Sequence, residues 1–162
     1  MKKIRWSEIL KFFISVIICE LAGVTGSIFT SPAIPHWYAT LVKPSFSPPN
    51  SIFAPVWTSL YFLMGISAYL VWRKGLDNHL VNSALRLFII QLILNTFWSI
   101  LFFGLRSPVL GLIEIIILWI AILLTTFSFF RVSKIAGFLL LPYILWVSFA
   151  VILNFSIWRL NL

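Results

Sequence analysis

Five long apolar runs, each with at most one charged side chain, dominate the sequence. They cover residues 12–30, 51–72, 87–105, 109–130 and 137–158, which is about two thirds of the chain. An α-helix needs ~20 apolar residues to cross ~30 Å of bilayer hydrocarbon. We therefore predict an all-α membrane protein, a bundle of five transmembrane helices over approximately 8–30, 51–73, 82–105, 108–131 and 135–158. These form a single domain over 1–162, with no room for a separate soluble catalytic domain.

The basic side chains are distributed unevenly between the two sides of such a bundle. The formal net charge is +8, which in a soluble domain would suggest a nucleic acid partner. Nine of the twelve Lys and Arg residues fall on the side of the N-terminus: Lys2, Lys3, Arg5, Lys11, Arg73, Lys74, Arg86, Arg131 and Lys134. Three fall on the other side: Lys43, Arg106 and Arg159. Since Lys and Arg are enriched in cytoplasmic loops, we expect a cell-membrane protein with a cytoplasmic N-terminus and no nucleic acid partner.

The connection between the first two predicted helices, residues 31–50, is long and unusual in composition. Six of the eight prolines lie in or next to it: Pro32, Pro35, Pro44, Pro48, Pro49 and Pro55. The segment is also rich in aromatic residues, which distinguishes it from a flexible Gly/Ser linker. We predict a long ordered loop that packs as a lid on the helix ends.

Three of the predicted helices carry aromatic and amide side chains along one face. The three stripes are Trp57, Tyr61, Gly65 and Tyr69 in the second run, Gln91, Asn95 and Trp98 in the third, and Tyr143, Trp146, Ala150 and Asn154 in the fifth. Polar groups inside a bilayer tend to face the bundle interior or a cavity. Convergence of the stripes beneath the lid predicts a pocket for a flat, largely apolar ring system. The alternative is that these residues only pack the helices together and hydrogen-bond between them.

Two acids lie inside the predicted membrane segments. For Glu20 we favour a protonated carboxyl that hydrogen-bonds between helices, and the alternative is a proton relay. Glu114 lies one turn inside the fourth helix, where we expect Arg106 or another interfacial amine nearby. Cys19, the single cysteine, is interpreted as core packing.

Familiar catalytic constellations are missing from the sequence. There is no HExxH, no Walker glycine loop, and no Ser or Cys with a plausible base, while His36 and His79 are both predicted in loops. Neither a conventional hydrolase or NTPase nor a metal site is expected.

Three segments of the sequence have a distinctive pattern: WYATLVKPSFSPPNSIFAPVWTSLYFLMG at 37–65, QLILNTFW at 91–98 and LLPYILWVSFAVILN at 140–154. Together they resemble the TspO/MBR family, the tryptophan-rich sensory proteins that include the mitochondrial translocator protein. The resemblance covers all five predicted helices. It implies a five-helix bundle, commonly a homodimer, whose first long loop closes a pocket for porphyrins and synthetic aromatic ligands. Porphyrin would be a ligand, and no cofactor is implied.

The resemblance also assigns roles to residues. The family's ligand-contact positions match Tyr38, Trp57, Tyr61, Asn95, Trp98, Trp146 and Ala150. Glu114 matches an acid of the fourth helix that is usually Asp. The sterol motif of animal members needs a Tyr where this chain has Phe155, so the chain departs from that motif and the resemblance does not carry sterol binding over to it.

Two functions follow from the resemblance. One is a tetrapyrrole receptor or sensor, with light-dependent porphyrin breakdown in which Trp57 and Trp146 are the candidate catalytic residues. The alternative is a transporter of porphyrins or other amphipathic molecules.

The charge bias generates a topological prediction. A compartment-sensitive reporter fused to the N-terminus should report the cytoplasm, whereas the same reporter at the C-terminus should report the opposite side. An external N-terminus would refute the assignment.

Overall fold

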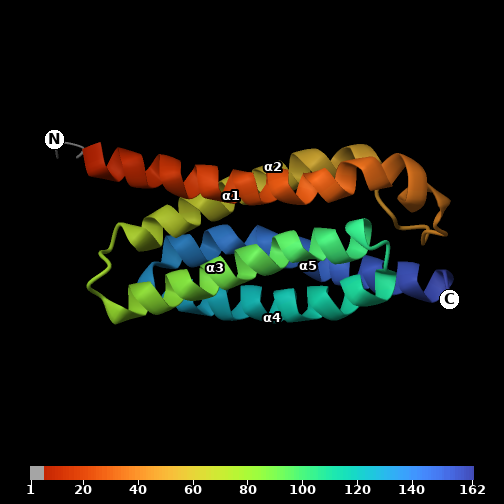
Figure 1. Cartoon of the computed structure of the whole chain (residues 1–162). Coiled ribbons are helices and arrows are strands. Elements are labelled where there is room, and N and C mark those ends of the chain that lie inside the picture. Colours follow the sequence, from red (N-terminus) through yellow and green to blue (C-terminus); the bar gives the residue numbers. More distant parts are fainter. Residues whose placement is uncertain (1–5) are drawn as a thin grey trace.

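Five helices make up the computed structural model, which describes residues 6–162 (Figure 1). They are α1 (Trp6–Ala33), α2 (Asn50–Trp72), α3 (His79–Ser99), α4 (Pro108–Val132) and α5 (Lys134–Leu160). Two short π-helical turns continue α1 and α3, namely η1 (Ile34–Tyr38) and η2 (Ile100–Gly104). All five helices are long and apolar enough to cross a membrane, which confirms the predicted fold class. Of the basic residues counted above, Lys2, Lys3 and Arg5 lie outside the described part of the chain.

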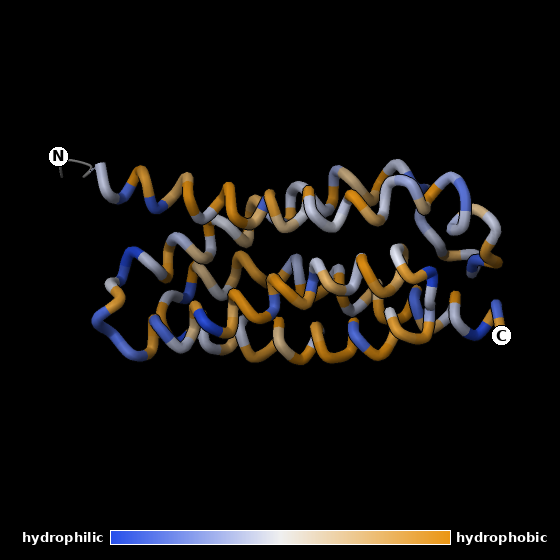
Figure 2. Tube along the Cα trace, in the orientation of Figure 1, coloured by the Kyte–Doolittle hydropathy of each residue, from blue (hydrophilic) through white to orange (hydrophobic). Residues whose placement is uncertain are grey.

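The helices run up and down alternately. α1 packs against α2 and α3, α4 packs against α3 and α5, and α2 packs against α5. The start of α1 lies at the same end as the α2–α3 and α4–α5 connections, and the end of α5 lies with the α1–α2 and α3–α4 connections (Figure 1). Most hydrophilic positions gather at these two ends, and the middle of the bundle is mainly hydrophobic (Figure 2). This is the pattern of a protein that spans a bilayer once per helix.

The α1–α2 connection is shorter than the predicted 31–50. α1 and η1 run through Tyr38, Ala39 and Thr40 are also helical, and the irregular stretch is 41–49. Pro32 and Pro35 each lack a backbone N–H, and a π-turn is a known local adjustment that lets a membrane helix continue past such a break. The prolines therefore modify the helix here instead of ending it. His36 consequently lies on η1, and His79 begins α3, so neither histidine is in a loop as predicted.

The remaining irregular stretch is fastened to the end of α5. The side chain of Asn161 bonds the backbone of Val42 twice: Nδ2 donates to the Val42 carbonyl at 2.9 Å, and Oδ1 accepts from the Val42 N–H at 3.0 Å. The Phe46 ring also packs edge-on against Phe149 of α5, with centroids 6.2 Å apart. These contacts hold residues 41–49, which we call the lid, against α5.

At the opposite end of the bundle, α1 and α2 close together. A Cβ built on Gly65 would lie 2.6 Å from the Cα of Val16, so only a glycine permits this backbone approach. Nearby, the Glu8 carboxylate bridges to Lys11 of its own helix at 3.0 Å and to Arg73, just past α2, at 3.5 Å. The two helices are thus in tight contact towards the end where α1 begins.

Gly65→Ala should destabilise the fold, because the new methyl group meets backbone atoms that cannot move aside. We expect a loss of about 2 kcal/mol in the free energy of unfolding, within the usual range for overpacking. Unfolding in mixed detergent micelles measures it. Gly104→Ala is the control, since its Cβ would meet side-chain atoms and no backbone, Phe29 at 3.1 Å and Ile100 at 3.8 Å. Equal stability of the two variants would contradict the close α1–α2 contact.

Candidate functional site

A cavity of about 310 Å³ lies in the lid half of the bundle. α1, α2, α3 and α5 and the turns η1 and η2 line it, and α4 does not. Nine aromatic side chains form much of its wall: Tyr38, Phe53, Trp57, Tyr61, Trp98, Phe102, Phe103, Trp146 and Phe149. Concave, mostly apolar cavities with a few convergent polar groups are typical of small-molecule sites.

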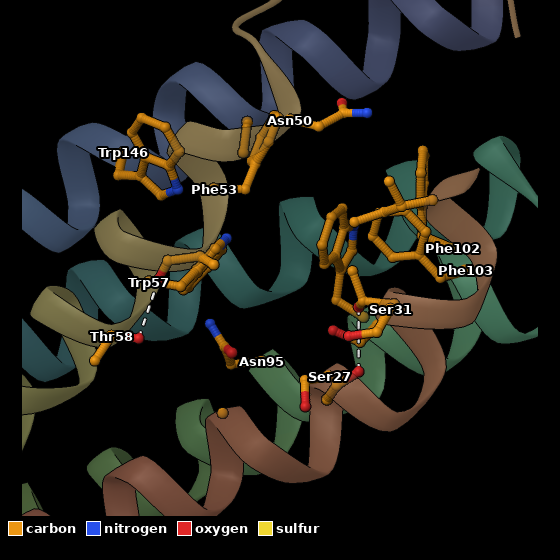
Figure 3. A pocket seen from close by; sticks show the side chains of 18 of the residues that line it. Ser27, Ser31, Asn50, Phe53, Trp57, Thr58, Asn95, Phe102, Phe103 and Trp146 are labelled. Atoms are coloured by element: carbon orange, nitrogen blue, oxygen red, sulfur yellow. Dashed lines mark hydrogen bonds between the residues drawn. The ribbon is translucent and has the colours of Figure 1, made fainter. Parts of the chain in front are cut away.

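All seven residues predicted to contact a ligand line this cavity: Tyr38, Trp57, Tyr61, Asn95, Trp98, Trp146 and Ala150. Figure 3 shows Trp57 and Trp146 on one side of the cavity, Phe102 and Phe103 on the other, and Asn95 between α1 and α2. Contact with a ligand stays a prediction for each of the seven.

The other stripe residues divide into two groups. Asn154 also lines the cavity. Gly65 packs on Val16, Tyr69 points towards Glu8, and Gln91 and Tyr143 are buried behind the cavity wall. For these four residues the packing interpretation describes the structure better than the cavity interpretation.

A chain of hydrogen bonds joins three helices at the inner end of the cavity. The Tyr61 hydroxyl donates to Asn95 Oδ1, and Asn95 Nδ2 donates to the Tyr143 hydroxyl at 2.8 Å. The Tyr143 hydroxyl in turn donates to Gln91 Oε1 at 2.9 Å. All four side chains are buried, where an unmade hydrogen bond is costly. The chain therefore fixes α2, α3 and α5 relative to one another.

Near the lid end, a second pair of bonds fixes the cavity wall. Trp98 Nε1 donates to Asn154 Oδ1 at 3.3 Å, and Asn154 Nδ2 donates to the Pro108 carbonyl at the start of α4 at 2.8 Å. The Trp98 ring stacks on Phe102, with centroids 5.2 Å apart and planes 20° apart. Trp98 is thus held in one orientation beside the cavity.

The two indoles on the other side are held by aromatic neighbours. Trp57 lies 5.6 Å from the Tyr61 ring and 6.3 Å from the Tyr143 ring, measured between centroids. Trp146 lies 6.1 Å from Phe53 and 5.6 Å from Phe149. Offset and edge-to-face pairs at these distances are favourable and restrict ring rotation. The cavity thus presents ordered aromatic faces.

α1 contributes to the cavity wall, although its sequence pattern was not among the predicted stripes. Apart from Val24, its cavity-lining residues are small or polar: Glu20, Gly23, Gly26, Ser27, Thr30 and Ser31. A Cβ on Gly23 would lie 2.5 Å from the Tyr61 ring, so this glycine brings α1 against the cavity. The repetition of Gly, Ser and Thr every three or four residues in an apolar run was the available signal, because small residues mark helix interfaces in membranes.

The two intramembrane acids differ from expectation. Glu20 makes no hydrogen bond or ion pair with another side chain in residues 6–162. The predicted interhelical hydrogen bond is therefore absent from this part of the chain. Glu20 lines the cavity instead. Glu114 is 4% exposed, and neither carboxyl oxygen has a hydrogen-bond partner within residues 6–162, Arg106 included. Arg106 is exposed at the turn before α4, whereas Glu114 points into the helix interface.

No three His, Cys, Asp or Glu side chains from Trp6 onward gather into a metal-ligand group. Cys19 is fully buried in the core, in agreement with its interpretation as a packing residue.

Tyr143→Phe should destabilise the protein more than its one lost hydroxyl suggests. Asn95 Nδ2 and Gln91 Oε1 would both lose a partner in a buried position, so we expect a loss of about 2 kcal/mol. Thermal unfolding in detergent tests this. Tyr69→Phe is the matched control, because the Tyr69 hydroxyl reaches only Glu8, at 3.5 Å. Equal melting temperatures of the two variants would argue against a structural role for the Tyr61–Asn95–Tyr143–Gln91 hydrogen bonds.

The comparisons with known proteins cover almost the whole chain. The model of the TspO/MBR family matches residues 15–159. A tryptophan-rich protein TspO of Chlorobaculum tepidum is 47% identical over 154 residues, which are 95% of this chain and 98% of that protein. The human translocator protein is 39% identical over 88% of this chain and 85% of its own length.

A tryptophan-rich sensory protein of Cereibacter sphaeroides is 34% identical over 96% of this chain and 92% of its own length. Family match and helical architecture agree, and the chain is thus a multi-pass membrane protein that belongs to the TspO/MBR family.

Proposed function

We propose that the protein is a membrane receptor that binds porphyrins and similar flat aromatic molecules in the cavity beneath the lid. The observation that carries the proposal is the cavity wall, in which Trp57, Trp98 and Trp146 are held by neighbouring aromatic rings around a space of about 310 Å³. Rigid indole faces stack well on flat ring systems. A few polar groups such as Asn95 supply orienting hydrogen bonds.

The position of the cavity favours a receptor over the alternative, a transporter. A carrier needs access to its site from both sides of the membrane in turn. Here the buried Tyr61–Asn95–Tyr143–Gln91 chain lies at the inner end of the cavity, and α1 and α2 are in close contact at Gly65 and Val16. These contacts support a site that a ligand enters and leaves from the lid half.

We propose further that the bound porphyrin is degraded slowly in light. An excited porphyrin can take one electron from an electron-rich neighbour, and dissolved dioxygen is the oxidant that then breaks down the resulting porphyrin radical and is itself reduced. Trp57 and Trp146 line the cavity wall beside the proposed ligand and are placed to give that electron. They are therefore the candidate catalytic residues.

The biological setting follows the sequence predictions. We propose that the protein resides in the cell membrane with the lid on the outer side, as the charge bias indicates. Bilayer lipid is then one partner, and a second copy of the chain is another, because the family resemblance implies a homodimer.

Porphyrin binding should depend on the indoles of the cavity wall. Removal of one aromatic face costs on the order of 1 kcal/mol or more, so Trp57→Ala or Trp146→Ala should weaken protoporphyrin binding about tenfold in the dark. Quenching of intrinsic fluorescence measures the affinity. Trp6→Ala is the control, because Trp6 is 86% exposed at the start of α1, away from the cavity. Parent-like affinity in both cavity variants would refute the site.

Photochemistry gives a separate readout. Trp57→Phe and Trp146→Phe keep an aromatic face for stacking but remove the more easily oxidised indole, so each should bind porphyrin and lose most of the light-dependent bleaching of its absorption band. Bleaching at the parent rate would reject the catalytic assignment and leave the binding site intact.

A further inference from the structure

Glu20 is the one lining residue of the cavity that carries a carboxyl group, and no Lys, Arg or His is among the described lining residues. It lies on the same face of α1 as Gly23 and Ser27, towards the inner end of the cavity. Its side chain is only partly buried. The carboxyl group therefore borders the cavity and is not sealed in the helix interface.

The carboxyl of Glu20 has no partner within the described residues. Both ion pairs in residues 6–162 belong to Glu8, at the far end of α1, and no side-chain hydrogen bond reaches Glu20. The nearby polar groups are already engaged, since the Tyr61 hydroxyl donates to Asn95 and not to Glu20. A carboxyl group at membrane depth without a partner is costly, and in membrane proteins such groups usually serve a function.

A cation lies at the opposite end of the site. Lys43 Nζ is 4.5 Å from the centroid of the Tyr38 ring, and Tyr38 lines the cavity. Lys43 belongs to the lid, whereas Glu20 lies more than three helical turns before the end of α1 at Ala33. The cavity thus has an acid at its inner end and a basic group beside its lid end.

We propose that Glu20 determines the specificity of the cavity, by favouring flat aromatic ligands that carry a cationic N–H group and by turning that group towards α1. This inference rests on the receptor function proposed above. A cationic N–H group gains an ion pair and hydrogen bonds with a carboxylate in a weakly polar cavity, where such pairs are strong. A ligand carboxylate is repelled from the same place and points to Lys43 and the lid. An acidic porphyrin therefore binds with its carboxylates outward and without help from Glu20.

The test compares two probes with the same ring system. At neutral pH, 9-aminoacridine is a cation and acridine is neutral. Both are titrated against the full-length protein in a neutral detergent, which avoids attraction of the cation to anionic lipid. The parent should bind 9-aminoacridine at least about tenfold more tightly than acridine, and protoporphyrin should displace both probes.

Glu20→Gln isolates the charge, because Gln has the same size and keeps a polar group. The preference for 9-aminoacridine should fall to threefold or less, with protoporphyrin affinity changed by less than about threefold. Asp77→Asn, in the α2–α3 connection, removes the same charge far from the cavity and should keep the full preference. Circular dichroism checks that each variant is folded.

The outcomes separate the two proposals. Protoporphyrin binding without a preference for the cation, or a preference that survives in Glu20→Gln, overturns the role of Glu20 and leaves the receptor function standing. A preference that depends on Glu20 without any binding of protoporphyrin supports the role of Glu20 and rejects porphyrin as the ligand. Failure of all three molecules to bind rejects both.

Discussion

The bundle depends on the requirement that polar groups inside a bilayer find partners within the protein. The hydrogen-bond network from Tyr61 through Asn95 and Tyr143 to Gln91 meets much of this requirement with four side chains from three helices, and only Gln91 Nε2 in the network has no partner within residues 6–162. Packing alone would allow α2, α3 and α5 to slide or rotate, because lipid tails are as apolar as the helix surfaces and provide little force between helices. The network fixes their register, and with it the positions of Trp57 and Trp146.

The same network marks the boundary between the structural and the proposed functional half of the molecule. Beyond it, towards the beginning of α1, Gly65 and Val16 bring helices into backbone contact and Glu8 joins α1 to Arg73. On the lid side, aromatic rings and small residues leave a cavity that Asn161 and Phe149 help to cover through their contacts with the lid. Tyr61 and Asn95 belong to both halves, because they line the cavity and carry the network.

Much of this arrangement was predictable from the sequence, for identifiable physical reasons. Helix number and length follow from bilayer thickness, and stripes at helical spacing placed Trp57, Asn95 and Trp146 on faces that do line the cavity. Periodicity does not tell which part of a stripe faces a cavity and which part faces another helix. That distinction depends on where helices diverge, so Gly65 and Tyr143 lie on the predicted faces but follow the packing alternative and not the cavity interpretation.

Other features lay beyond sequence reasoning. Pro32 and Pro35 predicted a loop, but a π-turn accommodates them and the helix continues. The positions of Glu20 and Glu114 depend on how α1 and α4 are rotated about their own axes. A hydrophobic run with few polar residues does not show which face of the helix points inward.

The central claim is that a flat ligand lies between the tryptophans of the cavity. The most direct measurement is nuclear magnetic resonance of the protein with ¹⁵N-labelled indoles. The protein is titrated with protoporphyrin in the dark. Porphyrin ring currents strongly shift the signals of groups close to the ring. The indole signals of Trp57 and Trp146 should move and saturate together, while that of Trp6 stays in place. Saturable binding that shifts Trp6 and leaves both cavity indoles unmoved would contradict the account.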